Sequence, residues 1–126
     1  MVTAAEFLSY PFGDSFTKAD PVKLQTLLDF VDSNYCQGII WRNNLPSRKD
    51  ALVLIAAHMG YLQWFAEADV ANAAIALREN GGGSNKPQAL DEYFKLTIYG
   101  SQYLDLQAQV ALVSINKPVI HTGFAF

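Results

Sequence analysis

Apolar side chains recur at helical spacing in three stretches of this chain. The first stretch begins at Asp20 and Pro21. This pair is typical of a helix start, because aspartate can accept hydrogen bonds from the free amides of the first turn and proline has no amide hydrogen to lose there. The stretch ends near residues 34–36, with Gly38 as the expected stop. Its apolar positions are Leu24, Leu27, Leu28 and Val31. Their spacing predicts the first long helix.

The second stretch predicts a helix that begins at Ser47 and runs to about Ala66. Asp50 lies three residues after Ser47, which approximates a capping box with a shorter acid. The apolar positions are Leu52, Ile55, Ala56, Met59, Leu62 and Phe65, widened by Val53 and Trp64. Nearly every side of this helix is apolar between residues 51 and 62, so we expect it to be the central and most buried one.

The third stretch begins at Pro87, and its apolar positions lie close to helical spacing. They are Leu90, Tyr93, Phe94, Ile98, Tyr99, Tyr103, Leu104 and Leu106. Gly100 lies inside this pattern, where glycine costs about 1 kcal/mol relative to alanine. We therefore expect close helix packing at Gly100, with Tyr99 and Tyr103 beside it and His58 as a buried packing histidine.

The segments between these stretches are less regular. Residues 39–46 predict a loop that contains a short helical turn. Residues 67–80 are alanine-rich, so they either continue the preceding helix or form an arm. Residues 81–85, Gly-Gly-Gly-Ser-Asn, form the clearest flexible break in the chain, although the break is too short to separate two domains.

Both ends of the chain lack helical periodicity. Residues 1–19 contain Pro11 and Gly13 and predict an extended arm or loop. Residues 110–126 are rich in valine and isoleucine before Pro118, and they predict a strand or an extended tail.

The expected fold class is therefore mainly α. We expect a small helical bundle with an extended N-terminal arm and a C-terminal tail, which has room for a short strand or hairpin. The chain of 126 residues suits a single domain, with the helical core at residues 20–109.

Composition adds an expectation about partners. Hydrophobic residues make up 51% of the chain, aromatic residues 13% and charged residues only 17%, which is below the roughly 25% of an average soluble domain. A small domain of this kind often buries apolar surface against a partner. We expect that partner or oligomer interface at the two ends of the chain. The candidate residues are Phe7, Tyr10, Phe12, Phe16, Val119, Ile120, His121, Phe124 and Phe126.

Charge and hydropathy exclude two classes of protein. The net charge is -3 and no run of lysine or arginine occurs, which argues against a protein that binds nucleic acid tightly. The most apolar stretch, residues 51–66, falls short of the roughly 20 residues that a membrane span needs. The first residues have no basic leader. We expect a soluble protein without a targeting address.

No catalytic, cofactor or metal site is predicted. His58 has no partner ligand at helical spacing, and the one cysteine, Cys36, has no nucleophile signature around it and is expected to be half-buried. The triple glycine lacks the lysine and hydroxyl residue of a phosphate-binding loop. The acidic pairs have spacings that do not align two carboxylates on one helix face: Glu67 with Asp69, and Asp91 with Glu92. We therefore expect no enzyme and no cofactor.

Three motifs, in this order, resemble the small head–tail connector or adaptor proteins of tailed phages, some of which are known only as a domain of unknown function. The first is an aromatic arm followed by an Asp-Pro helix start, FGDSFTKADPVKLQTLLDFVD. The second is an alanine-rich helix with an embedded histidine, ALVLIAAHMGYL. The third is TIYGSQYLDL, with Thr97, Tyr99, Gly100, Tyr103 and Leu106. Between the last two, residues 67–86 depart from the Gly/Ser/Val-rich, hairpin-like stretch that related proteins often have.

The resemblance implies a role in the virion neck, in a particle assembled in the host cytoplasm. It implies a homo-oligomeric ring of twelve copies that binds the portal protein, extends the DNA channel and offers a platform to the next neck or tail protein. DNA would pass through this channel without specific binding, and no membrane is involved. The C-terminal segment, residues 110–126, would dock on the portal or on a neighbouring subunit.

Three other interpretations stay open at this point. The chain could be a different neck protein, such as a stopper or a tail terminator, for which we would expect more strands. It could be a monomeric, non-viral helical module for protein–protein interaction, such as a regulator or inhibitor. It could also be a small-molecule-binding helical bundle that uses Trp41, Trp64 and His58.

Overall fold

The computed structural model describes residues 2–82 and 87–121, with side chains for residues 2–77 and 91–112. The elements, in chain order, are α1 (Ala4–Leu8), the short 3-10 helix η1 (Gly13–Phe16), α2 (Pro21–Asn34), α3 (Ile39–Arg42), α4 (Leu45–Trp64), α5 (Ala68–Gly82), α6 (Pro87–Phe94) and α7 (Ile98–His121). Within the described ranges there is no strand, so the prediction of a mainly helical bundle is confirmed.

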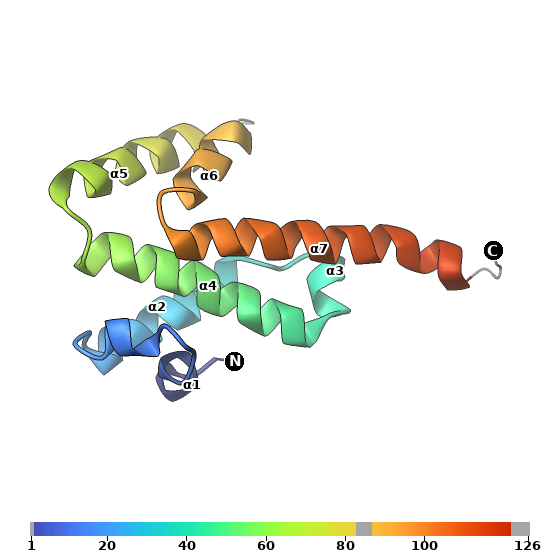
Figure 1. Cartoon of the computed structure of the whole chain (residues 1–126), viewed down its shortest axis with the longest axis horizontal. Coiled ribbons are helices and arrows are strands. Elements are labelled where there is room, and N and C mark those ends of the chain that lie inside the picture. Colours follow the sequence, from blue (N-terminus) through green and yellow to red (C-terminus); the bar gives the residue numbers. More distant parts are fainter. Residues whose placement is uncertain (1, 83–86, 122–126) are drawn as a thin grey trace.

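Helix α4 forms the centre of the molecule. It lies between α2 on one side and α7 on the other, while α5 and α6 form a hairpin of helices at the end where α7 begins (Figure 1). The buried residues of α4 are Ala51, Leu52, Val53, Ile55, Ala56, Ala57, His58, Met59, Gly60 and Leu62. The prediction that the all-round apolar helix is the central one is therefore confirmed.

The start and the end of α2 match the sequence prediction, but the residue that closes the helix does not. The carboxylate of Asp20 accepts a hydrogen bond of 2.9 Å from the Val22 amide, and Pro21 is the first helical residue. The helix ends at Asn34, and Cys36, with φ 58°, follows in the left-handed conformation, so the chain turns before it reaches the expected stop at Gly38. Gly38 instead precedes α3.

Arg48 stabilises this reversal of the chain. Its Nε donates to the carbonyl of Cys36 at 3.0 Å, and its Nη2 donates to the carbonyl and the carboxylate of Asp32 at 3.1 Å and 2.7 Å. Three hydrogen bonds from one guanidinium hold the end of α2 against the start of α4, so a cysteine can occupy the left-handed position.

Helix α4 begins earlier than predicted and does not use the expected cap. It starts at Leu45, with Pro46 in its first turn. Asp50 is not part of a capping box; its carboxylate accepts a hydrogen bond of 2.7 Å from the hydroxyl of Tyr10.

The prediction of an extended N-terminal arm is wrong. The segment folds into α1 and η1 and packs against the bundle, because its aromatic side chains complete the core. Phe7 and Phe16 are 0% and 1% exposed, and their ring centroids lie 5.1 Å apart in an edge-to-face arrangement. Thr3 and Glu6 form a capping box at the start of α1, and Glu6 pairs with Lys49 of α4.

The second half of the chain is divided differently from the prediction. The alanine-rich segment forms a separate helix, α5, after a turn at residues 65–67, and the third apolar stretch forms two helices instead of one. Helix α6 ends at Phe94 and α7 begins at Ile98, because the chain turns at residues 95–97.

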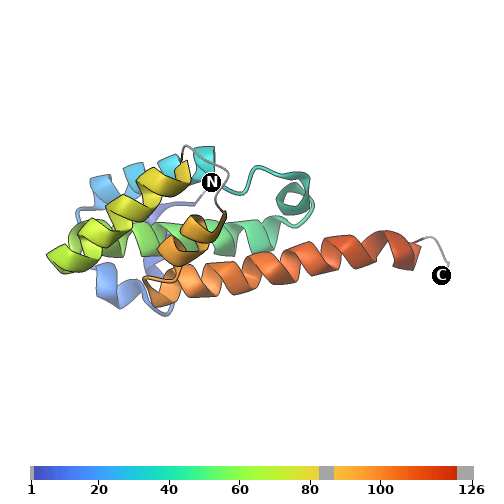
Figure 2. The ribbon, with the colours of Figure 1, turned by 90° about the horizontal axis from the view of Figure 1, so that it is seen from above.

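The prediction of a strand or extended tail from residue 110 is wrong as far as His121, because α7 continues to that residue. Residues 122–126 lie outside the described residues. The last part of α7 extends beyond every other described element in both views (Figures 1 and 2). Val110 is buried and Leu112 is exposed, so the buried packing of α7 ends near Val110 among the residues with described side chains.

Candidate functional site

The second and third sequence motifs meet at one buried contact between α4 and the start of α7. Thr97 directly precedes α7, and its hydroxyl oxygen accepts a hydrogen bond of 3.0 Å from the amide of Gly100. Thr97 is thus the N-cap of α7. The same oxygen lies 2.7 Å from Nδ1 of His58, at the centre of α4, and the two atoms are hydrogen-bonded. One hydroxyl therefore both caps α7 and ties it to the central helix.

Gly100 makes this contact sterically feasible. A Cβ at this position would overlap the carbonyl oxygen of Phe94 and would lie 2.8 Å from Nδ1 of His58. Both neighbours are fixed, since one is backbone and the other is a fully buried ring. The cost of glycine inside a helix is therefore offset by the close approach of α4, the α6–α7 turn and α7.

Aromatic rings surround this contact. The ring centroid of His58 lies 4.5 Å from that of Tyr93, at right angles, and 5.1 Å from that of Phe94. The Tyr103 ring follows at 4.9 Å from Phe94, and burial raises the pKa of the Tyr103 phenol above its usual range. We call these residues with Thr97 and Gly100 the histidine cluster.

The four residues expected at the helix packing are not all in one place. His58, Gly100 and Tyr103 belong to the histidine cluster. Tyr99 is half-buried and packs against the N-terminal segment instead, with its ring centroid 5.1 Å from that of Phe12.

The residues expected at a partner interface separate into three groups. Phe7 and Phe16 are covered by the chain's own core, and this burial corrects the expectation that they contact a partner. Tyr10 and Phe12 are half-buried and line a surface groove. Val119, Ile120 and His121 lie on the extending part of α7 and their side chains are outside the described residues, as are Phe124 and Phe126 altogether.

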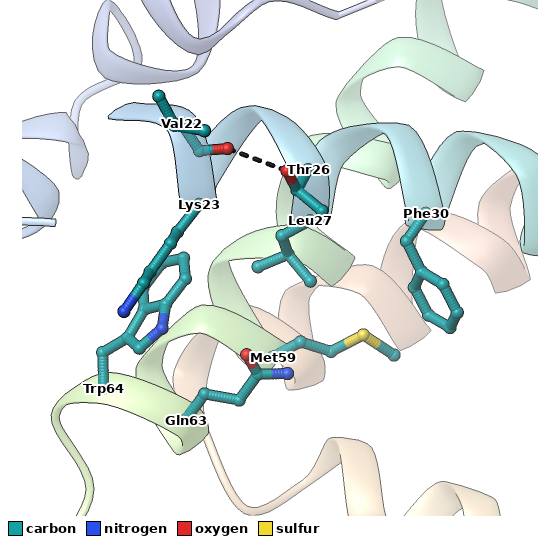
Figure 3. Close-up of a pocket in the computed structure, with 8 residues that line it drawn as sticks. All are labelled: Val22, Lys23, Thr26, Leu27, Phe30, Met59, Gln63 and Trp64. Atoms are coloured by element: carbon teal, nitrogen blue, oxygen red, sulfur yellow. Dashed lines mark hydrogen bonds between the residues drawn. The ribbon is translucent and has the colours of Figure 1, made fainter. Parts of the chain in front are cut away.

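One surface groove runs between α2 and α4 (Figure 3) and has a volume of about 420 Å³. It is lined by Val22, Lys23, Thr26, Leu27, Phe30, Met59, Gln63 and Trp64. Figure 3 shows Phe30 at one end and Lys23 with Trp64 at the other. Val22 and Phe30 are 73% and 45% exposed, so the α2 side of this α2/α4 groove is an open apolar surface.

A larger groove, of about 660 Å³, lies between α4 and α7 and is closed by the loop after α1. It is lined by Tyr10, Pro11, Phe12, Asp50, Leu54, Ile98, Tyr99, Gln102 and Leu106. Asp50 is the one charged residue among the lining residues whose side chains the structure describes, and Ile98 is 66% exposed. Burial and the hydrogen bond to Asp50 raise the pKa of Tyr10, so the tyrosine stays a hydrogen-bond donor. We call this surface the α4/α7 groove.

The residues proposed for a small-molecule site do not come together. Trp41 stacks on Tyr103 with a centroid distance of 6.5 Å, Trp64 lines the α2/α4 groove, and His58 is inside the histidine cluster. The part of the chain with described side chains contains no group of three or more histidine, cysteine or acidic residues that could hold a metal ion. Cys36 is buried rather than half-buried, which raises the pKa of its thiol to about 11 and keeps it protonated at neutral pH.

In the ranges that the structure describes, no helix has the combination of length and apolar content that a membrane crossing requires. No protein-family profile, curated protein or solved structure matches this chain.

Sequence reasoning missed two of the contacts that position these surfaces. The three hydrogen bonds of Arg48 and the bond from Tyr10 to Asp50 join positions that are 12 to 40 residues apart. No local pattern marks such pairs, because the partners are distant in the sequence and nothing in the residues around each one indicates the other. Thr97, by contrast, directly precedes a helix, where its N-cap preference is a usable signal.

Proposed function

We propose that this chain is a structural subunit of the head–tail connector ring of a tailed phage. In this role it binds the portal protein, extends the DNA channel and provides the platform for the next neck or tail component, with no catalytic step. The observation that carries the proposal is the direct contact between His58 of the second motif and Thr97 and Gly100 of the third. The two motifs are far apart in the sequence, yet they form one unit of packing, which is how a motif that encodes a fold is expected to behave.

The distribution of exposed apolar side chains supports a subunit with more than one neighbour. Large apolar residues with more than half of their surface exposed lie on several elements: Val22 on α2, Ile39 on α3, Leu45 on α4, Ile75 on α5, and Ile98 and Leu112 on α7. A ring subunit must cover two flanks and also contact the components above and below it. Two grooves and a helix that extends from the body provide surfaces of this kind.

The helical architecture favours an adaptor over the strand-rich neck proteins, the stopper and the tail terminator. The acidic net charge of -3 suits a channel that lets DNA pass without holding it. The ring of twelve copies and the location in the virion neck follow from the resemblance to connector proteins and are part of the proposal.

The direct test is the mass of the purified protein and of its complex with portal protein, combined with electron microscopy of the particles. We expect closed rings coaxial with the portal. A protein that stays monomeric with portal protein present, at concentrations where the portal itself is assembled, would overturn the proposal.

A truncation supplies a second test. Removing residues 118–126 should leave a folded subunit that no longer attaches to its neighbours, because these residues lie at or beyond the end of α7. Wild-type attachment by the truncated chain would refute the role of this segment in docking.

A further inference from the structure

The extending part of α7 is a helix that lacks a described neighbour. Residues 113–121 continue α7 beyond the other elements, and their sequence, VSINKPVIH, contains one lysine, Lys117, and no acidic residue. Most of the stability of helices in proteins comes from the packing of an apolar face, and this segment contains two valines and two isoleucines. We therefore expect these apolar residues to be buried in a contact outside their own subunit.

The α4/α7 groove has the complementary chemistry. Apolar and aromatic side chains dominate its described lining, in which Asp50 is the one charged residue. The Asp50 carboxylate accepts one hydrogen bond from Tyr10, and a carboxylate has room for further donors. The best-matched occupant is an apolar helix that carries a single cation.

We propose that the end of α7 from one copy lies in the α4/α7 groove of the next copy, with Lys117 opposite Asp50. This inference rests on the proposed function and names the contact that joins subunits in the ring.

The geometry requires two different copies. The wall of the groove is built by Ile98, Tyr99, Gln102 and Leu106 of α7 itself, so the end of the same continuous helix cannot fold back into it. The contact is head-to-tail, with different surfaces on the two partners, and repeated contacts of this type close into a ring when the rotation per subunit permits.

Charge distinguishes this groove from the α2/α4 groove. Lys23 is the charged residue among the lining residues of the α2/α4 groove, and it would repel Lys117. The α4/α7 groove offers an attractive partner to the same lysine.

Charge reversal tests the pairing. Asp50→Lys and Lys117→Glu should each weaken self-association by roughly tenfold or more, measured by sedimentation velocity across a concentration series. The double variant Asp50→Lys with Lys117→Glu should return to within about threefold of wild type, because it restores opposite charges. Asp105→Lys makes the same charge change at an exposed position of α7 outside the groove and should associate as wild type does.

Two controls separate the pairing from folding. Tyr10→Phe removes the hydrogen bond to Asp50 but keeps the carboxylate charge, so association should persist. Lys117→Glu lies beyond the buried part of α7, so it reports on association even if Asp50→Lys fails to fold. Wild-type association in Lys117→Glu, or a double variant no better than the single ones, overturns the pairing.

Disulfide trapping locates the contact. Gln102→Cys combined with Lys117→Cys should give a ladder of linked subunits under oxidation, whereas Thr26→Cys with Lys117→Cys should not, since Thr26 lines the other groove. Linking through Thr26→Cys but not through Gln102→Cys would place the end of α7 in the α2/α4 groove and overturn this inference.

The two proposals can fail separately. If rings form normally but both the charge and the trapping tests fail, the connector role stands and this inference is overturned. If the wild-type chain forms no rings, both proposals are overturned.

Discussion

The start of α7 makes two contacts of different kinds. On one side it meets α4 at the histidine cluster, where a cap, a glycine and a buried ring leave no space for another atom. On the other side Tyr99 packs against Phe12 of the N-terminal segment, and the exposed Ile98 lines the α4/α7 groove. The first contact fixes where α7 lies, and the second leaves apolar surface available. The difference suggests that stability and association are divided between the two sides of one helix.

The largest effect is expected from breaking the first contact with Gly100→Ala. The added Cβ overlaps the carbonyl oxygen of Phe94, and backbone cannot move aside as a side chain can. We expect the free energy of unfolding to fall by at least about 3 kcal/mol, measured by urea denaturation. Gly38→Ala is the matched control: no atom lies within 4 Å of its Cβ, so its cost should be limited to the roughly 1 kcal/mol by which alanine is the poorer N-cap of α3. Equal effects of the two substitutions would contradict the proposed packing role of Gly100.

A smaller effect is expected when only the hydroxyl of Thr97 is removed. Thr97→Val keeps the shape of the side chain but leaves the buried Gly100 amide without its cap and removes the partner of His58 Nδ1. We expect a loss of about 2 kcal/mol in the free energy of unfolding. Thr97→Ser retains the hydroxyl and should lose about 1 kcal/mol or less. If serine proved as damaging as valine, the methyl group rather than the hydrogen bonds would carry the contact.

These two residues also show what could be predicted from the sequence. A glycine inside a periodic apolar pattern implies a close approach, and an apolar helix with one histidine implies a buried ring, so both halves of the histidine cluster could be located. Their contact could not, because it depends on the turn at residues 95–97 that separates α6 from α7. That turn has no proline or glycine to mark it, and the apolar spacing continues across it.

The N-terminal segment was mispredicted for a related reason. Proline and glycine in a short aromatic stretch usually mark an extended loop, yet Phe7 and Phe16 carry enough apolar surface to hold two short helical segments on the bundle. Tertiary packing overrode local preference there. At the other end of the chain, valine and isoleucine favoured a strand, but residues 110–121 continue a helix that is already anchored by its first half.

At the second contact, across the α4/α7 groove, Tyr10→Phe should lower the stability of the protein only slightly. The lost hydrogen bond from the Tyr10 hydroxyl to Asp50 is solvent-exposed, so we expect a cost of about 0.5 to 1 kcal/mol in the free energy of unfolding. Tyr61→Phe, also partly exposed, has no described bond from its hydroxyl and should change stability by about 0.5 kcal/mol or less. A loss of about 3 kcal/mol for Tyr10→Phe would mean that the groove side holds α7 as firmly as the histidine cluster does.

The smallest effect is the pH dependence of stability at the first contact, between α4 and α7. There Cys36 lies near Tyr103. Burial raises the pKa of the Cys36 thiol from 9.0 to about 11, and burial also raises the pKa of Tyr103. Both groups hold their protons more tightly in the folded state, so their contribution to stability is complete below about pH 8 and is lost as pH rises through the folded pKa values. We expect the free energy of unfolding to fall between pH 8 and pH 9, and Cys36→Ala to lose less over this interval, by about 0.5 kcal/mol. Urea denaturation of both proteins at the two pH values measures the difference. An identical decline would mean that Cys36 gains a water-filled path to solvent in the folded protein, and the α4 side of α7 would then be less tightly packed than the histidine cluster requires.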